Sequence, residues 1–279
     1  MIIENNANLK KLTTFRMGGF AKNLYIPESE EELIELVNED KARYIIGGGS
    51  NLIINNRLFD NVVSLRKMNL DFLDCGDGEF VVGSSVRLQT LVKKINEVGY
   101  GGIEYLFSVP GLVGGATVMN AGRGQAFNRC ISDYIIAVKI LRDKKVVWLE
   151  KRDCRFEYRK SVFSETDDVV LAVRFKFPPV QKSESEKLRK ERIELCRKKQ
   201  DNSAPNFGTV FCESNKTIMQ MFKYLPIGRG NGISYSRKTA NWMLNEGGTF
   251  TTTMALLERV KKIHKFFHSK CRTEVVIWN

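Results

Sequence analysis

The chain has 279 residues, enough for one large domain or two to three smaller ones. Hydrophobic residues make up 43% and charged residues 27%, which is ordinary for a soluble globular protein, and no long apolar run argues for a membrane-spanning helix. The net charge of +12 fits nucleic acid or an anionic small substrate, and we favour the substrate because no basic motif is interleaved with aromatic residues. The first residues lack the basic-then-apolar order of a secretory signal, so we expect a cytoplasmic protein.

The N-terminal segment has the pattern of a small α/β layer. Apolar residues 24–26 predict a strand, and Ser29 and Glu32 form a capping box for a helix over residues 30–39. Residues 62–65 predict another strand.

A glycine loop, Gly47-Gly48-Gly49-Ser50-Asn51, lies between two further predicted strands, residues 44–46 and 52–54. Consecutive backbone amides at such a loop form a concavity suited to a phosphate or pyrophosphate. The loop is not a P-loop, because no Lys-Ser/Thr follows the glycines, and it is not a Rossmann fingerprint, because a strand rather than a helix follows. The sequence therefore predicts a strand–loop–strand cradle for an anionic group.

A second glycine-rich stretch, SVPGLVGGATVMNAGRG, occupies residues 108–124, after a strand predicted at 80–82 and a helix predicted at 88–97. Its five glycines lie around an apolar run without charges, residues 116–119. Glycine lets another group approach the main chain closely, so the stretch is typical of backbone packed against a large flat ligand. Tight turns alone would also explain it, but the other glycine cluster favours the ligand.

The second half of the chain begins with more strands and ends in a separate unit. Three strands are predicted over residues 135–141, 146–149 and 169–177. Polar residues up to 200 predict a solvated helical connector. In the last unit we expect a helix over about residues 252–268 and a terminal strand over residues 274–278.

The six cysteines show no C-x-x-C spacing, so they indicate neither a zinc site nor a redox pair, and we expect free thiols, mostly buried. The only two histidines, His264 and His268, share a helix face at i, i+4, as a metal pair requires. No third ligand accompanies them, so a metal is the less favoured interpretation. The scarcity of histidine also argues against a Ser-His or Cys-His nucleophile.

Three polar residues are candidates for chemistry, and each has a simpler explanation. Arg159 suits binding of a carboxylate or of developing negative charge, or is a surface arginine. Thr209 follows a glycine near a turn, where its hydroxyl is a positioned proton donor or merely closes an ST-turn. Glu274 begins an otherwise apolar terminal strand, so its carboxylate is either functional or only marks the end of the strand that is exposed to solvent.

Six short motifs in fixed order resemble the UDP-N-acetylenolpyruvoylglucosamine reductase family, in its shorter subtype. They are Thr13-Thr14-Phe15-Arg16-x-Gly18-Gly19, the Gly47–Asn51 loop, Pro110-Gly111-x-x-Gly114-Gly115-Ala116 leading to Asn120-Ala121-Gly122, Tyr158-Arg159-x-Ser161, Gly208-Thr209-Val210-Phe211 and Glu274-Val275. Any one motif is weak, but six in order across almost the whole chain are specific.

The resemblance implies an α+β fold, with a two-subdomain FAD-binding domain of the vanillyl-alcohol-oxidase (PCMH) type and a smaller C-terminal α/β substrate domain. The expected boundaries are residues 1–65 and 66–179 for the two FAD-binding subdomains, 180–201 for the helical connector and 202–279 for the substrate domain. The implied contacts to FAD are Gly47, Gly48, Gly49, Ser50, Asn51, Pro110, Gly111, Gly114, Gly115, Ala116, Asn120 and Gly122.

The implied reaction belongs to peptidoglycan precursor synthesis. It reduces UDP-N-acetylglucosamine enolpyruvate to UDP-N-acetylmuramate with NADPH, through FAD. Thr209 would donate a proton, while Arg159 and Glu274 would stabilise the enolic intermediate. The implied contacts to the nucleotide-sugar substrate are Tyr158, Ser161 and Asn241. No metal, nucleic-acid or membrane partner is expected.

The chain departs from the family's pattern on the substrate side. Thr209 stands where the family has serine or sometimes cysteine, and its methyl group restricts χ1. Cys212-Glu213-Ser214 replaces Lys-Asn-Pro, so a carboxylate would face the substrate's diphosphate and repel it. Thr239 replaces a histidine. Two alternatives therefore stay open: a paralogue that uses FAD on another substrate, and a flavin-binding protein without turnover. NADPH consumption with and without the enolpyruvyl nucleotide separates them.

Overall fold

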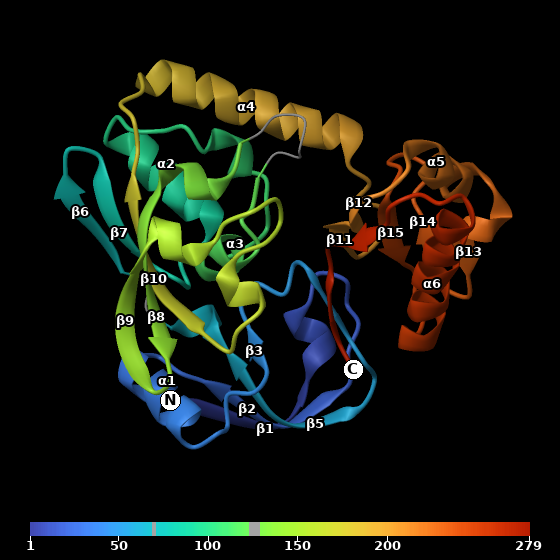
Figure 1. Cartoon of the computed structure of the whole chain (residues 1–279), viewed down its shortest axis with the longest axis horizontal. Helices are drawn as coiled ribbons and strands as arrows, with labels where there is room; N and C mark the ends of the chain where they lie inside the picture. Colours follow the sequence, from blue (N-terminus) through green and yellow to red (C-terminus); the bar gives the residue numbers. More distant parts are fainter. Residues whose placement is uncertain (69–70, 123–128) are drawn as a thin grey trace. The chain divides into compact units, whose positions relative to one another are not determined.

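The structure is a computed structural model that describes residues 1–68, 71–122 and 129–279 (Figure 1). Arg123 and Gly124, at the end of the second glycine-rich stretch, lie outside the described residues. The chain forms two compact units, which we describe separately. The first unit comprises Met1–Glu4, Leu24–Gly48 and Asn61–Cys196, and the second comprises Asn5–Asn23, Gly49–Asp60 and Arg197–Asn279. This division interleaves segments, whereas the predicted boundaries follow the chain in order and stay a prediction.

The first unit contains a five-stranded antiparallel sheet in the order β6-β7-β10-β8-β9. The strands are β6 (Phe72–Gly76), β7 (Glu79–Gly83), β8 (Ile135–Arg142), β9 (Lys145–Glu150) and β10 (Val169–Lys176). The central strand β10 is buried from Val169 to Val173, because its apolar side chains are covered on both faces. Asp143 and Lys144, at φ of 48° and 65°, form the tight turn between β8 and β9.

Helices α1 (Glu30–Asn38), α2 (Leu88–Glu97) and α3 (Val113–Val118) pack on this sheet. Helix α4 (Lys182–Lys199) also begins in this unit (Figure 1), where its Arg192 and Cys196 contact Ser108. The apolar face of α2 places Leu91 and Ile95 in one core with Phe80 of β7 and Val173 of β10. Each fully buried aliphatic side chain of this kind stabilises the fold by about 1.5–3 kcal/mol.

A four-stranded sheet in the order β1-β2-β5-β3 contains the N-terminal strands. They are β1 (Ile2–Asn8), β2 (Phe20–Ile26), β3 (Ile45–Ile46) and β5 (Leu58–Ser64). Strand β3 runs parallel to β5, with Ile45 opposite Val63. In the first unit Leu33 and Leu36 of α1 pack with Val63, so the helix covers the apolar end of this sheet.

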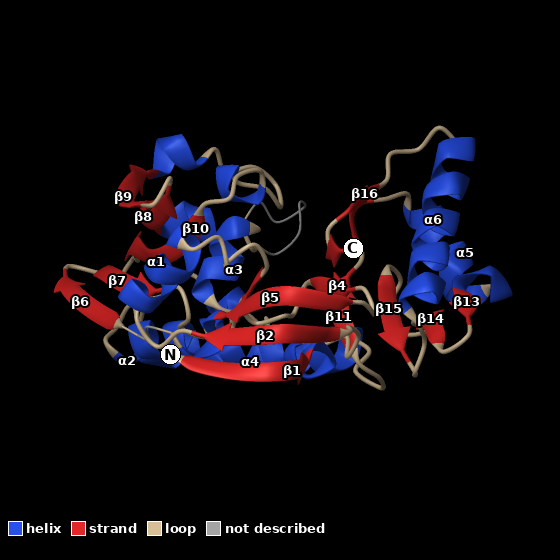
Figure 2. Ribbon diagram, turned by 90° about the horizontal axis from the view of Figure 1, so that it is seen from below, coloured by secondary structure: helices blue, strands red, loops and turns tan. Residues whose placement is uncertain are grey.

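The second unit packs two helices on one face of an antiparallel sheet in the order β11-β15-β14-β13 (Figure 2). The elements are β11 (Asn206–Thr209), β13 (Arg229–Gly230), β14 (Ile233–Tyr235), β15 (Trp242–Asn245), α5 (Lys216–Tyr224) and α6 (Phe250–Phe266). Phe222, Tyr235, Met243, Leu256 and Val260 belong to their common core.

Two pairs of short strands complete this unit. They are β12 (Phe211–Glu213) with β16 (Arg272–Thr273), and β4 (Leu52–Ile54) with β17 (Val276–Trp278). Strand β17 runs parallel to β4, with Val276 opposite Leu52, so the end of the chain pairs with the strand that follows the first glycine loop.

Most predicted elements are present, and the exceptions have physical reasons. The helix predicted over residues 88–97 is α2. Ser29 Oγ accepts from Glu32 N at 3.3 Å, which is one half of the predicted capping box, but Glu32 Oε2 accepts from Glu28 N at 2.8 Å rather than from Ser29 N. The last helix begins two residues earlier than predicted, because Thr249 Oγ1 caps it by accepting from Thr252 N. Helix α3 was not predicted, since two glycines in six residues disfavour a helix by about 1 kcal/mol each.

The cysteines are free, but only Cys154 and Cys196 are buried, so the prediction of mostly buried thiols is partly wrong. Burial raises the pKa of the Cys154 thiol to about 12, from an ordinary value near 9. Because the folded pKa is the higher one, this thiol stabilises the fold below pH 9 and loses that contribution as the pH rises towards 12.

We expect a thiol reagent at pH 8 to modify exposed Cys75 first and Cys154 only after unfolding, as peptide mass spectrometry would measure. Fast labelling of Cys154 in the folded protein would contradict this.

Candidate functional site

The second glycine-rich stretch packs against the segment that joins β7 to α2. Val113 N donates to Val86 O at 2.9 Å, and Gly114 N donates to Ser84 O at 2.8 Å. A Cβ on Gly114 would lie only 2.9 Å from Ser84 Cβ, so this position requires glycine. Gly115 differs, because a Cβ there would have no atom of the described chain within 4 Å. The stretch thus forms a wall whose Gly115 faces open space.

The first glycine loop contacts this wall within the first unit. A Cβ on Gly48 would lie 3.2 Å from Gly111 Cα, and one on Gly47 would lie 3.7 Å from Leu112 Cδ1. Pro110 precedes this contact and is exposed, whereas Ala116 is buried inside α3. The fold therefore brings together two glycine motifs that lie far apart in the sequence.

The remainder of the first glycine loop belongs to the second unit. Gly49 has a φ of 63°, and a Cβ there would lie 1.9 Å from Leu12 O, so no other residue fits. Thr14 N donates to Gly49 O at 2.9 Å, and this bond joins the loop to the motif of residues 13–19. Asn51 Nδ2 donates to Glu274 O at 3.1 Å. Ser50, between Gly49 and Asn51 in the loop, is half-buried.

Two buried hydroxyl groups at the Gly114 wall test whether FAD fits. Ser84 and Ser85 are 2% and 1% exposed, and the described residues supply no hydrogen-bond partner for either Oγ. A buried hydroxyl left unpaired costs roughly 1–3 kcal/mol. Two unpaired hydroxyls at this wall suit a ligand that carries hydrogen-bond acceptors, as FAD does, so these residues fit the cofactor. We did not predict the two serines, although small residues between a strand and a helix, Gly83-Ser84-Ser85, were a signal.

Asn120 and Gly122 continue the wall beyond α3 and hold a neighbouring turn. Asn120 Nδ2 donates to Glu157 O at 2.8 Å, while its Oδ1 accepts from Ser132 N at 3.3 Å. Gly122 O accepts from Arg159 Nη2 at 2.9 Å. Predicted cofactor residues and a predicted catalytic residue are therefore in direct contact in the first unit.

Arg159 lies at the tip of a two-residue turn. Glu157 and Lys160 exchange backbone hydrogen bonds of 3.0 and 3.3 Å, which leaves Tyr158 and Arg159 as the central residues. Arg159 has a φ of 57°, and its guanidinium lies 5.6 Å from the Tyr158 ring centroid. Ser161, which is 1% exposed, donates its Oγ to the carbonyl of the last residue of α3 at 2.7 Å. The turn is thus anchored on the glycine wall.

Thr209 and Glu274 lie on neighbouring segments of the second unit. Thr209 ends β11 and is exposed, whereas the next residue, Val210, is buried. Glu274 N donates to Val210 O at 2.9 Å, so this bond joins the two segments. Burial raises the pKa of the Cys212 thiol, while the charge of Arg272 lowers it and that of half-buried Glu274 raises it. The Glu274 carboxylate therefore acts electrostatically on Cys212, three residues after Thr209.

Asn241, predicted to contact substrate, binds the backbone of Phe211 with both polar side-chain atoms. Its Nδ2 donates to Phe211 O at 2.8 Å, and its Oδ1 accepts from Phe211 N at 3.0 Å. Its own φ is 59°, a left-handed conformation that asparagine adopts more readily than most residues. A contact to substrate stays a prediction.

Two of the sequence departures have partners in the second unit. Glu213 Oε1 lies 3.3 Å from Arg272 Nη2, so a cation stands beside the carboxylate that we expected to repel a diphosphate. Both side chains are about 40% exposed, so the pair offsets the repulsion rather than stabilising the fold by much. Thr239 Oγ1 donates to Lys199 O, and Lys238 Nζ donates to Arg197 O at 2.7 Å, which ties this segment to the end of α4.

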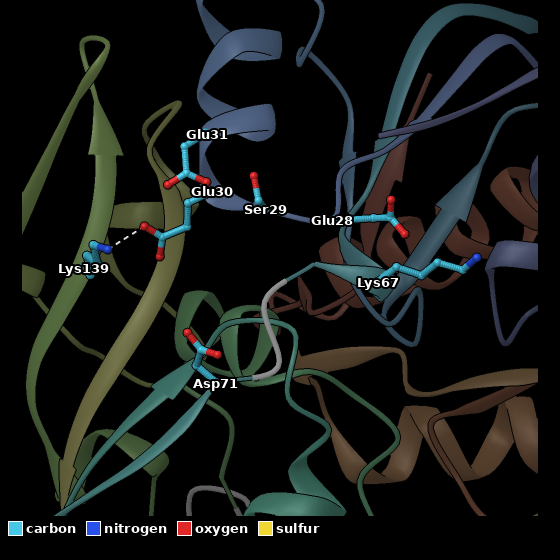
Figure 3. Close-up of a pocket in the computed structure, with 7 residues that line it drawn as sticks. All are labelled: Glu28, Ser29, Glu30, Glu31, Lys67, Asp71 and Lys139. Carbon is cyan, nitrogen blue, oxygen red and sulfur yellow. Dashed lines mark hydrogen bonds and ion pairs between the residues drawn. The ribbon is translucent and has the colours of Figure 1, made fainter.

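The hollow drawn in Figure 3 does not suit the cofactor, although it also lies in the first unit. The side chains around it are Glu28, Ser29, Glu30, Glu31, Lys67, Asp71 and Lys139. Lys139 Nζ is committed to Glu30 Oε2 at 2.5 Å, and the other carboxylates would repel a diphosphate.

The two histidines do not act together. His264 is fully buried. Its Nε2 accepts from Asn215 N at 3.0 Å, and its Nδ1 donates to Val260 O at 2.9 Å. His268 is exposed beyond the end of α6. Across residues 1–68, 71–122 and 129–279, no cluster of three or more metal-ligating side chains occurs. Nor does any helix in these ranges have the length and apolar character needed to cross a bilayer.

The fold and the glycine wall define an FAD-binding protein, and the FAD binding domain family matches residues 21–149. Relatives named UDP-N-acetylenolpyruvoylglucosamine reductase extend the likeness to the whole chain. The one from Thermotoga petrophila is 30% identical over 95% of both chains, and the one from Petrotoga mobilis is 31% identical over 99% of this chain and 94% of its own. The crystal structure of the reductase of this name from Thermus caldophilus superposes with a TM-score of 0.81 at 25% identity and covers both chains completely.

The chain belongs to the UDP-N-acetylenolpyruvoylglucosamine reductase family. The resemblance stated from six motifs is thereby confirmed, as are the α+β FAD-binding fold and the FAD cofactor. The roles of the individual site residues remain predictions.

The open space at Gly115 gives a direct test of where FAD lies. Gly115→Val adds a side chain whose Cβ meets no described atom, so we expect an unchanged Tm for the apoprotein but loss of FAD binding. The yellow colour of the purified protein and titration of the apoprotein with FAD would measure this. Gly114→Val is the matched comparison, because its side chain meets Ser84 and should lower the Tm itself. A Gly115→Val protein that binds FAD like wild type would place the cofactor elsewhere.

Proposed function

We propose that this protein reduces the enolpyruvyl group of UDP-N-acetylglucosamine enolpyruvate to give UDP-N-acetylmuramate, with NADPH as electron donor. The observation that carries the proposal is the hydrogen bond from Glu274 N to Val210 O. It joins the segment of Thr209, the proposed proton donor, to that of the Glu274 carboxylate. Family membership and the FAD-fitting wall support the redox step, because FAD held at this wall would supply the transfer of hydride from NADPH to the enolpyruvyl group.

The chain's own residues would act on protons and charge. The exposed Thr209 hydroxyl would donate a proton to the carbon next to the one that receives hydride. Arg159 would stabilise the negative charge that develops on the enolic oxygens of the substrate. Its guanidinium is oriented for this by the Gly122 carbonyl and by the tight turn that fixes its backbone. Glu274 would also stabilise the enolic intermediate, as the resemblance implies.

Substrate contacts are assigned to Tyr158, Ser161 and Asn241, as the resemblance implies. Ser161 already donates to a backbone carbonyl, so it would accept rather than donate a bond to substrate. Because NADPH and nucleotide sugars are cytoplasmic metabolites, the proposed reaction places the protein in the cytoplasm. The Glu213–Arg272 pair supports retention of the diphosphate substrate, since the departure that we expected to repel it is partly neutralised.

The test is steady-state oxidation of NADPH by the FAD-loaded protein. We expect slow NADPH oxidation without substrate and a large increase when UDP-N-acetylglucosamine enolpyruvate is added. A flavoprotein that oxidises NADPH equally slowly with and without this nucleotide would have another substrate. A folded protein that takes up no FAD would contradict the proposed redox step itself.

A further inference from the structure

A continuous set of hydrogen bonds joins Asn241 to the first glycine loop within the second unit. Val210 N donates to Asn241 O at 3.2 Å, and the Asn241 side chain makes its two bonds to Phe211. On the other side, Val210 O accepts from Glu274 N at 2.9 Å. Glu274 O in turn accepts from Asn51 Nδ2 at 3.1 Å. Val276 N closes the series by donating to Asn51 O at 3.1 Å.

This arrangement leaves little freedom to the residues that carry the proposed chemistry. Val210 and Phe211 are 0% and 1% exposed, and their backbone is held by Asn241 on one side and by β16 on the other. Thr209 is the exposed residue directly before this pinned pair. Because consecutive Cα atoms are about 3.8 Å apart, a shift of Val210 moves the hydroxyl of Thr209 with it.

We propose that Asn241 is a positioning residue: through Phe211 and Val210 it sets the place of the Thr209 hydroxyl and of Glu274 relative to the glycine loop. This inference rests on the proposed function and changes what is expected of Asn241. A positioning residue affects the step in which substrate receives hydride and proton, whereas a substrate contact affects substrate binding. A displacement of about 1 Å in such a group is enough to slow a reaction by about a hundredfold.

The conformation of Asn241 makes a clean variant available. Asn241→Gly removes the side chain but tolerates the φ of 59°, so the backbone conformation is retained. Asn241→Asp keeps the acceptor for Phe211 N but turns an anionic oxygen towards Phe211 O. When that carboxyl is protonated it becomes a donor again, so Asn241→Asp should regain activity relative to wild type as the pH falls.

The matched structural control is Asn245→Ala at the end of β15, the strand that begins directly after Asn241. Asn245 also binds backbone with its side chain, donating to Phe15 O at 2.8 Å and accepting from Gly247 N and Gly248 N. These side-chain bonds involve neither the segment of Thr209 nor that of Glu274. Its loss should lower the Tm and leave the rate constants of the folded fraction near those of wild type.

The experiment follows the two half-reactions of each FAD-loaded protein separately by stopped-flow absorbance. For Asn241→Gly we expect flavin reduction by NADPH to stay within about twofold of wild type, while reoxidation by the enolpyruvyl nucleotide slows about tenfold to a hundredfold at nearly unchanged KM. A raised KM at unchanged maximal rate would overturn the proposal in favour of a substrate contact. Equal slowing of both half-reactions, or unchanged rates, would also overturn it.

If Asn241→Gly does not fold, the pH dependence of Asn241→Asp decides in the same way. A wild type that never reoxidises with this nucleotide contradicts the proposed function instead.

Discussion

Thr209→Val is expected to slow reduction of the enolpyruvyl substrate by about 10²–10⁴-fold, the usual contribution of a general acid. Valine keeps the branched shape of threonine, so the change removes the hydroxyl without opening a cavity at β11. Flavin reduction by NADPH should continue at the wild-type rate, because that half-reaction takes no proton from this residue. Stopped-flow absorbance of the flavin measures both steps in one preparation.

Thr209→Ser is the control for this prediction. Serine retains the hydroxyl and removes the methyl group that restricts χ1, so its activity should equal or exceed that of wild type. If Thr209→Val reduces the substrate as fast as wild type, another group is the donor. If Thr209→Ser is as slow as Thr209→Val, then the methyl group rather than the hydroxyl matters.

Arg159→Ala is expected to lower kcat about a hundredfold, or roughly 3 kcal/mol of transition-state stabilisation, with a much smaller rise in KM. The reason is that Arg159 is proposed to stabilise negative charge that develops on the substrate during the reaction and is absent from the bound substrate. Glu274→Gln, which keeps the size of the side chain, should also lower kcat more than it raises KM. Initial rates over a range of substrate concentration separate the two constants.

Arg159→Lys is the informative companion variant. Lysine retains the positive charge but cannot reproduce the planar fork that donates to Gly122 O at 2.9 Å, so a partial loss is expected. A change confined to KM in Arg159→Ala would identify a binding residue instead. Full activity in that variant would remove Arg159 from the mechanism.

Local sequence signals predicted the elements whose structure is set by neighbours along the chain. The N-cap at Ser29 and the helix α2 are examples, because a cap and a helical face depend only on residues a turn away. The strand after the first glycine loop was predicted correctly for the same reason, from its apolar residues 52–54.

Features that depend on distant partners were not predicted. Helix α3 forms despite Gly114 and Gly115, because close packing of Gly114 on Ser84 outweighs the poor helix propensity of glycine. Strands β12 and β16 are two to three residues long and carry no clear alternation, so their pairing is set by tertiary contacts.

The candidate site shows the same limit. The glycine motifs and Arg159, Thr209 and Glu274 were singled out from sequence, but nothing in it indicated the two bonds between Asn241 and Phe211. These residues are 30 positions apart, and no pattern of spacing encodes such a contact. The small residues Gly83-Ser84-Ser85 were a sequence signal, but the burial of the two serine hydroxyls depends on the packing of the distant Gly114 segment.

The central claim is that this protein transfers hydride to an enolpyruvyl nucleotide, and a single turnover tests it most directly. The FAD-loaded protein is reduced anaerobically with one equivalent of NADPH and then mixed with UDP-N-acetylglucosamine enolpyruvate. We predict rapid return of the oxidised flavin spectrum, with a product whose mass spectrum shows the gain of two hydrogen atoms. A flavin that stays reduced in the presence of this nucleotide, and is reoxidised only when oxygen is admitted, would contradict the claim.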